Sequence, residues 1–193
     1  IKKWHKFYNK INFEGYVNFK KDYDHYLKKF KQISFKSFAK KKKNTDYTIT
    51  IGNTILREKI FMQIKNNRYL KNKSIIFNSS QISEGTKIGS GSIIMNNVLI
   101  ANDVKIGKNC HIHGNAIIGH NVSIGDNVNI GAGVFIAGFS KIKKCADINS
   151  NSVIIKKCII GEYSIVGGGS VVIKDVKKKT TVMGSPAKKI FGK

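Results

Sequence analysis

Residues 117–130 read IIGHNVSIGDNVNI, and isoleucine occupies positions 118, 124 and 130. The spacing of six continues on both sides without interruption, from Ile76 to Val172. A small or β-branched residue stands four positions after each of these anchors, as Val122 and Val128 do here. A helix repeats every 3.6 residues and a strand every two, so neither element alone produces a period of six. The period predicts a solenoid built from short repeated units.

Glycine often follows the anchor, as at Gly119, Gly125 and Gly131, where the chain must turn a tight corner. This pattern resembles the hexapeptide repeat of left-handed parallel β-helices. In that fold three hexads make one triangular coil, so that each residue stacks on the residue 18 positions later and coils lie ~4.8 Å apart. The left hand follows from the resemblance alone, because parallel crossovers are otherwise right-handed. Cys110 and Cys158 fall in the small-residue position and are expected to fill the core.

Ahead of Ile76 the pattern changes to mixed α and β segments. The expected elements are strands over residues 11–19 and 47–51, a helix over residues 22–30, and a second helix that follows Gly52. This second helix carries Leu56, Ile60 and Ile64 at helical spacing, with Asn53 or Thr54 as its N-cap. The sequence therefore predicts a small α/β domain over residues 1–74 and a β-helix with a closing segment over residues 75–193.

Charge and composition limit the possible classes of function. The chain of 193 residues has a net charge of +24, and all but two of its 35 basic residues are lysine. Nucleic-acid binders favour arginine for paired contacts to bases, so we expect no nucleic-acid partner. The positive surface fits small polyphosphate ligands instead. Hydrophobic residues make up 41% of the chain, enough for a core, but no run approaches the ~18 apolar residues of a membrane span.

The cysteines and histidines do not have the spacing of a metal site. Three cysteines in no metal-ligand pattern indicate a reducing compartment, and we predict a cytoplasmic protein. His111, His113 and His120 lie in the repeat region, but a zinc site needs three imidazoles that converge on one ion. Related zinc-dependent β-helix enzymes show His-x-x-x-x-His, which these histidines do not reproduce. We therefore predict no metal.

Several segments resemble the bacillosamine/perosamine group of nucleotide-sugar acetyltransferases, to which sialic acid O-acetyltransferases are related. They are IGHNVSIGD at residues 118–126, DYTITIGN at 46–53 with REKI at 57–60, GGGSVVIKDV at 167–176 and GSPAK at 184–188. The last two identify only the wider acetyltransferase superfamily. The His120 segment preceded by the small domain is more specific.

The resemblance implies that His120 is the general base, which takes a proton from the sugar's 4-amino group as that nitrogen attacks an acetyl thioester. The next position, usually Glu or Asp in the family, is Asn121 here. An amide can orient an imidazole but cannot stabilise an imidazolium by charge. A second family histidine, nine residues further on, is replaced by Asn129. His111 and His113 are expected to contribute little to turnover.

The resemblance also implies acetyl-CoA as the co-substrate. Gly138 lies 18 residues after His120 and should stack on it, and the family uses the backbone N–H at this position for the thioester carbonyl. A second row of small residues 18 apart includes Ala132 and would give a slot for a pantetheine arm. The candidate CoA contacts are Gly138, Ser150, Gly168, Lys156 and Lys188. Lys156, with Lys157 and the run Lys177–Lys179, is a candidate for the CoA phosphates.

In this family the small domain binds the nucleotide sugar. Gly52 and Asn53 lie in the matching strand-to-helix step, and Asn18 stands where the family has Asp at the end of its second strand. The family's glycine-rich first turn is missing from the chain. Either a first strand and turn precede Ile1 in the natural protein, or the nucleotide pocket has degenerated. The candidate substrate contacts are Asn18, Gly52, Asn53 and Asn129.

The sequence thus predicts an acetyl-CoA-dependent N-acetyltransferase that acts on the amine of a nucleotide-linked aminodeoxy sugar, without naming the nucleotide or the sugar. The alternatives are a sugar O-acetyltransferase and a non-catalytic β-helix scaffold, the latter suggested by Asn121, Asn129 and the missing turn. We expect a homotrimer with sites between subunits, because outward apolar or small residues would otherwise form an exposed patch. These residues are Ala101, Ala132, Phe135, Ala137 and Phe139.

Overall fold

The computed structural model describes residues 15–17 and 31–191 of the chain. Most of the strand expected over residues 11–19, all of the helix expected over residues 22–30, and Asn18 lie outside the described residues. Within them, Tyr16 forms a parallel bridge with Gln32. Among these residues no helix is long and apolar enough to cross a membrane.

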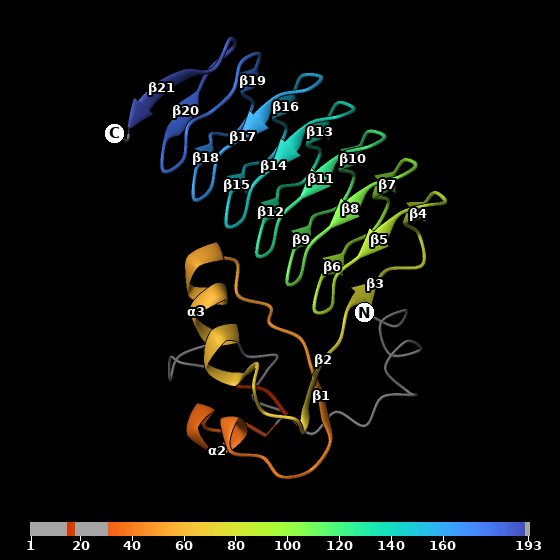
Figure 1. Ribbon diagram of the computed structural model, residues 1–193, viewed down its shortest axis with the longest axis vertical. Helices are drawn as coiled ribbons and strands as arrows, with labels where there is room; N and C mark the ends of the chain where they lie inside the picture. Colours follow the sequence, from red (N-terminus) through yellow and green to blue (C-terminus); the bar gives the residue numbers. More distant parts are fainter. Residues whose placement is uncertain (1–14, 18–30, 192–193) are drawn as a thin grey trace.

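A βαβ unit forms most of the described small domain (Figure 1). Strand β1 (Thr45–Tyr47) pairs in parallel with β2 (Leu70–Asn72), and helix α3 (Thr54–Ile64) provides the crossover between them. The short helix α2 (Phe35–Ala39) precedes β1. The strand predicted over residues 47–51 is therefore wrong in its bounds, because the chain leaves the sheet after Tyr47 and turns toward the β-helix. Both α2 and β2 were too short to be recognised in the sequence.

Asn53 caps α3, which confirms one of the two predicted caps. Its Oδ1 accepts a hydrogen bond from the backbone N–H of Leu56 at 2.9 Å. The helix buries Thr54, Arg57, Ile60 and Ile64, whereas Leu56 is 44% exposed. The apolar spacing alone predicts that Leu56 faces the core, but the side chain buried at this point of the helix is that of Arg57.

Three parallel sheets make the walls of a left-handed β-helix, with strands of two residues from β3 to β19. The β10 sheet contains β4 (Gln81–Ile82), β7 (Leu99–Ile100), β10 (Ile117–Ile118), β13 (Phe135–Ile136), β16 (Val153–Ile154) and β19 (Val171–Val172). The β11 sheet contains β5 (Lys87–Ile88), β8 (Lys105–Ile106), β11 (Ser123–Ile124), β14 (Lys141–Ile142) and β17 (Ile159–Ile160). The β12 sheet contains β3 (Ile75–Ile76), β6 (Ile93–Ile94), β9 (His111–Ile112), β12 (Asn129–Ile130), β15 (Asp147–Ile148), β18 (Ile165–Val166), β20 (Thr181–Met183) and β21 (Lys188–Phe191).

The predicted period of 18 residues sets the register of all three walls from β3 to β19. Ile118, for example, pairs with Ile100 below and Ile136 above. The second residue of each strand points inward, and the anchors from Ile94 to Val172 are at most 5% exposed. Cys110 and Cys158 lie among them, which confirms their place in the core. Strand β21 returns antiparallel to β20 and closes the C-terminal end.

Asparagine recurs at the corners between the walls. Non-glycine residues adopt positive φ at regular intervals, as Asn109, Asn121 and Asn127 do at 54°, 58° and 57°. Asparagine is among the side chains that tolerate this left-handed conformation best. The corners are therefore specified by residue type as well as by spacing.

Candidate active site

The three rows of corners give the β-helix three long edges. The His120 edge, between the β10 and β11 sheets, consists of residues 119–122, 137–140 and 155–158. The Arg57 edge, between the β11 and β12 sheets, consists of residues 107–110, 125–128, 143–146 and 161–164. The glycine edge, between the β12 and β10 sheets, consists of residues 113–116, 131–134, 149–152 and 167–170.

His120 is exposed on its edge, and its ring is held by a neighbouring amide. The imidazole Nδ1 lies 2.9 Å from Asn121 Oδ1, so Nδ1–H donates to the amide oxygen and Nε2 carries the lone pair. The left-handed backbone of Asn121 brings its side chain beside the ring. Among the described residues none donates a hydrogen bond to Nε2. This nitrogen is available to accept a proton from a ligand.

Gly138 lies against that same nitrogen. A Cβ at position 138 would come within 2.8 Å of His120 Nε2, so glycine is required for the imidazole to lie where it does. Phe139 contacts the ring edge-on, with centroids 4.9 Å apart, and Lys156 Nζ lies 5.7 Å from the Phe139 ring. The structure thus brings His120, Asn121, Gly138 and Lys156 together on one edge.

The other candidate CoA contacts lie elsewhere on the chain. Ser150 and Gly168 are exposed on the glycine edge, where the Ser150 carbonyl accepts the N–H of Gly169 at 2.9 Å. The whole width of the β10 sheet separates them from the His120 edge. Lys188 is exposed on β21. One chain alone does not gather these residues around His120.

The candidate substrate contacts lie near the Arg57 edge. Gly52 and Asn53 are exposed at the start of α3, which Figure 1 shows beside the turns of β9, β12 and β15. Asn129, on β12, pairs in register with His111. Its Nδ2 donates to Asp147 Oδ1 at 2.8 Å, and its Oδ1 accepts a hydrogen bond from His113 Nε2 at 3.1 Å. Asn129 therefore has one amide N–H left for a ligand.

Two residues whose importance the sequence did not reveal lie at this junction. Arg57 is fully buried, and His111 is 5% exposed beside it. Burial and the Arg57 charge lower the pKa of His111 to about 4, so its ring is neutral near pH 7. The one available signal was that Arg57 is one of only two arginines among 35 basic residues.

Neither of two hollows on the surface includes His120. One, of about 430 Å³, is lined by Lys143, Glu162, Asp175 and neighbouring residues. The other, of about 480 Å³, lies at residues 31–34, 37 and 41. The described residues contain no cluster of three or more His, Cys, Asp or Glu side chains that could hold a metal ion. The exposed His120 edge needs a second surface to enclose a ligand.

Comparison with known proteins shows what this chain is similar to. The model of the bacterial transferase hexapeptide (six repeats) matches residues 103–138. A dTDP-3-amino-3,6-dideoxy-alpha-D-galactopyranose 3-N-acetyltransferase from Aneurinibacillus thermoaerophilus is 47% identical over 51 residues, which is 26% of this chain and 27% of that protein. The matched segment thus spans about a quarter of that relative.

Solved structures extend the similarity to most of the chain. Perosamine N-acetyltransferase from Caulobacter crescentus, solved with CoA and GDP-perosamine, has a TM-score of 0.74 at 26% identity and covers 76% of this chain and 70% of its own. WeeI from Acinetobacter baumannii has a TM-score of 0.78 at 25% identity and covers 97% and 91%. The acetyltransferase domain of PglB from Neisseria gonorrhoeae, solved with acetyl coenzyme A, shares the fold with a TM-score of 0.83 at 20% identity and covers 91% and 85%.

The repeat and its three-walled coil define a hexapeptide-repeat transferase. Within that class, the chain is similar to a dTDP-amino-sugar N-acetyltransferase over 51 residues and to the structure of perosamine N-acetyltransferase over 76% of its length.

Proposed function

We propose that this protein transfers an acetyl group from acetyl-CoA to the amine of a nucleotide-linked aminodeoxy sugar. The observation that carries the proposal is the His120 imidazole, whose Nε2 is free beside the backbone of Gly138 while Asn121 holds Nδ1–H. An imidazole fixed in this tautomer has the lone pair that a general base needs. The CoA and nucleotide-sugar complexes of the perosamine N-acetyltransferase support the choice of substrates.

In the proposed reaction the amine nitrogen of the sugar attacks the thioester carbonyl carbon while His120 Nε2 takes a proton from that nitrogen. The Gly138 N–H donates to the carbonyl oxygen as negative charge develops on it. The tetrahedral intermediate collapses, the C–S bond breaks, and the imidazolium returns its proton to the CoA thiolate. Asn121 keeps the ring oriented through both transfers, although it cannot stabilise the imidazolium by charge.

CoA is proposed to bind along the edges that flank the β10 sheet. Gly138 would contact the thioester, Ser150 and Gly168 the pantetheine arm, and the exposed Lys156 and Lys188 the phosphates. Gly52, Asn53 and Asn129 would contact the nucleotide sugar, as would Asn18.

A second copy of the chain is proposed to complete the site, in a homotrimer. The outward side chains of the β10 sheet are apolar over five strands, and Leu99, Ile117 and Phe135 are each 41–42% exposed. The β11 sheet instead presents Lys87, Lys105 and Lys141 outward. Packing of the apolar wall against a neighbour would join one copy's His120 edge to another's glycine edge.

The three cysteines, all free and buried, support a reducing compartment and hence a cytoplasmic location.

An acceptor panel tests the proposal. Release of CoA thiol from acetyl-CoA is measured with UDP-, dTDP- and GDP-linked amino sugars and with the matching hydroxyl sugars. We expect turnover with at least one amino sugar and none with its hydroxyl counterpart. Turnover on hydroxyl acceptors alone would establish the O-acetyltransferase. The hydroxyl sugars are included because Asn121 replaces the family's acidic residue beside His120. No turnover with any acceptor would support the non-catalytic scaffold.

A further inference from the structure

The segment that joins β1 to α3 crosses the β-helix with its carbonyl groups bound to side chains instead of to a sheet. We call residues 49–53 the junction turn. His111 Nε2–H donates to the Ile49 carbonyl at 2.8 Å. Arg57 Nη1 donates to the carbonyls of Ile51 and Gly52 at 2.6 and 3.1 Å. Two side chains thus determine the path of the turn.

The same guanidinium also binds two successive coils of the β-helix. Nε donates to the Asn109 carbonyl at 2.9 Å. Nη2 donates to the carbonyls of Asn127 and Val128 at 3.0 and 3.2 Å. The Arg57 side chain is fully buried between the two surfaces. It therefore fixes the distance between the junction turn and the Arg57 edge.

The chemistry of the contact requires arginine. Five N–H groups in a rigid plane meet five carbonyl oxygens and His111 Nδ1, which lies 3.3 Å from Nη1. His111 can accept there because its ring is neutral. Among the described residues no carboxylate contacts the guanidinium. Its role is thus to hold backbone groups in place, and a lysine, with three donors on one atom, cannot reproduce it.

We propose that Arg57 is a positioning residue, which fixes the junction turn over the coils of Asn109 and Asn127 and so sets where Gly52 and Asn53 meet the nucleotide sugar. The second half of this statement rests on the proposed function. The Glu58 carboxylate adds a tie at the same edge, since it lies 3.2 Å from Lys144 Nζ and accepts the Tyr163 hydroxyl at 3.1 Å. That tie holds the helix, whereas among the described residues the side chains of Arg57 and His111 bond to the carbonyls of Ile49, Ile51 and Gly52 in the turn.

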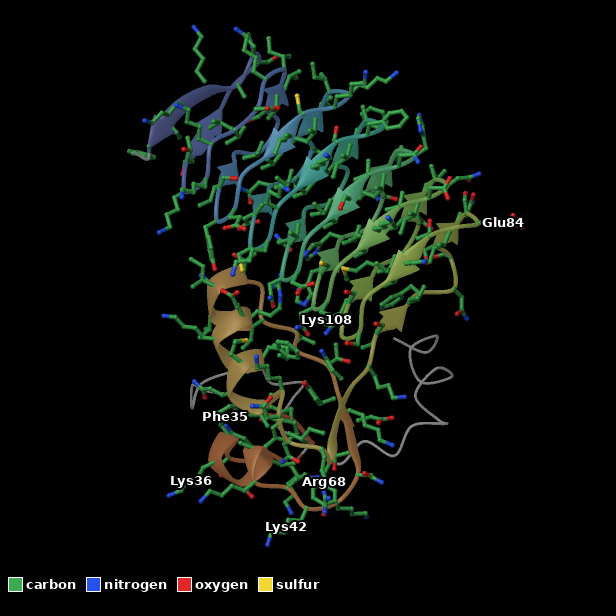
Figure 2. The ribbon with its side chains drawn as sticks, in the orientation of Figure 1. Phe35, Lys36, Lys42, Arg68, Glu84 and Lys108 are labelled. Atoms are coloured by element: carbon green, nitrogen blue, oxygen red, sulfur yellow. The ribbon has the colours of Figure 1, made fainter. Side chains whose placement is uncertain are left out.

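The test compares Arg57→Lys with Arg68→Lys in the full-length chain. Arg68 is the matched control, because it is the other arginine and bonds only to its neighbour Tyr69 among the described residues. Figure 2 shows Arg68 at the end of the small domain that lies away from the β-helix. Hydrogen–deuterium exchange is followed for peptides over residues 48–56 and over the coils, and steady-state kinetics for both substrates.

We expect Arg57→Lys to speed exchange in the junction turn while the coil amides stay protected. Its KM for the nucleotide sugar should rise about tenfold or more, with kcat and the KM for acetyl-CoA within about twofold of wild type, because a displaced turn loses binding common to ground and transition states. Arg68→Lys should change none of these values.

Unchanged exchange and unchanged KM in a folded Arg57→Lys would overturn the proposal. Faster exchange with an unchanged KM for the nucleotide sugar would overturn only the claim that the turn sets where Gly52 and Asn53 meet that substrate. If Arg57→Lys does not fold, His111→Leu, which loses the Ile49 bond, serves with the same two readouts and the same outcomes. A wild-type protein without acetyl transfer would refute the proposed function, while exchange would still decide whether Arg57 holds the turn.

Discussion

At the scale of single residues, the proposed base His120 is oriented by Asn121, its neighbour at a corner of the β-helix. The left-handed corner brings the amide of Asn121 back onto the imidazole that precedes it, at 2.9 Å. The family's acidic residue at this position would orient the ring and also favour its charged form. Asn121 keeps the orienting hydrogen bond but carries no charge, so it does not favour the charged form of the ring.

His120→Ala should lower kcat by a factor of about 10² to 10⁴, because the amine then loses its proton acceptor. The KM for acetyl-CoA should change little, since the imidazole acts on the acceptor's proton. The control is His113→Ala, whose ring starts from the glycine edge and is bonded to Asn129 on β12. If His120→Ala kept near-normal turnover while His113→Ala abolished it, the assignment of the base would be wrong.

Asn121→Glu should move the acid limb of the kcat profile to higher pH. A carboxylate beside the ring favours the imidazolium, so a higher pH is needed to have the neutral base. The left-handed backbone at position 121 makes the substitution cost about 1 kcal/mol of stability. The pH profile of thiol release measures the effect, with Asn115→Glu as the control at an equivalent corner with φ of 61°. A profile that stays in place would show that residue 121 does not contact the ring in solution.

At the scale of elements, the sequence predicted the solenoid well and the small domain poorly. The β-helix follows from a period of six that every coil repeats. A departure from the sequence pattern in one hexad therefore does not change the prediction, because the neighbouring hexads keep the period. The junction turn has no such repetition. Its backbone is fixed by Arg57 and His111, and the second lies 54 residues further along the chain, so no local pattern could reveal the contact.

The candidate site likewise has one feature that the sequence predicted and one that it did not. The stacking of Gly138 on His120 is a local consequence of the 18-residue period and was predictable. The expectation that His111 matters little considered only turnover, and the structure gives this residue a separate structural role. Its ring is buried and bonded to both Ile49 and Arg57.

Docking of the junction turn on β9 should make the protein sensitive to acid. The pKa of His111 is about 4 in the folded chain, below the 6.5 of a free imidazole. The stabilisation is therefore complete above about pH 6.5 and is lost as the pH falls toward 4, by on the order of 3 kcal/mol. Thermal melts between pH 7.5 and 4.5 measure this dependence.

His111→Leu should be less stable than wild type at pH 7.5, because the Ile49 carbonyl loses its donor. Its melting temperature should also fall less steeply with acid. The control is His113→Leu, which removes the half-buried neighbouring ring, 6.5 Å from that of His111, but no hydrogen bond to the junction turn. Equal acid dependence in wild type and His111→Leu would contradict the role of His111.

At the scale of the whole molecule, the three walls differ sharply in character. The β10 sheet is apolar on its outer face, the β11 sheet is lysine-rich, and the β12 sheet is partly covered by the small domain. An apolar wall flanked by the His120 edge and the glycine edge is the surface that a trimer would bury.

Ile117→Glu should dissociate the trimer and abolish acetyl transfer while leaving the coil folded. Ile117 points outward from β10 and is 42% exposed, so its replacement does not disturb the core. The control is Ile165→Glu, an outward isoleucine on the β12 sheet that is 40% exposed. Light scattering should give three times the chain mass of 21.6 kDa for wild type and Ile165→Glu. A wild-type monomer at micromolar concentration would contradict the trimer and the inter-subunit site.

The stacking of equivalent residues every 18 positions also restricts how such a chain can change in length during evolution. Loss or gain of one hexad between Asn109 and His120 would carry every later residue to the next edge, a third of a turn around the prism. His120 would then lie on a different edge from its present one, although each coil could still pack. Only whole coils can be added or removed there without moving His120 and Gly138 together away from the junction turn, so insertions and deletions should come in multiples of 18 and keep the angle between the junction turn and His120.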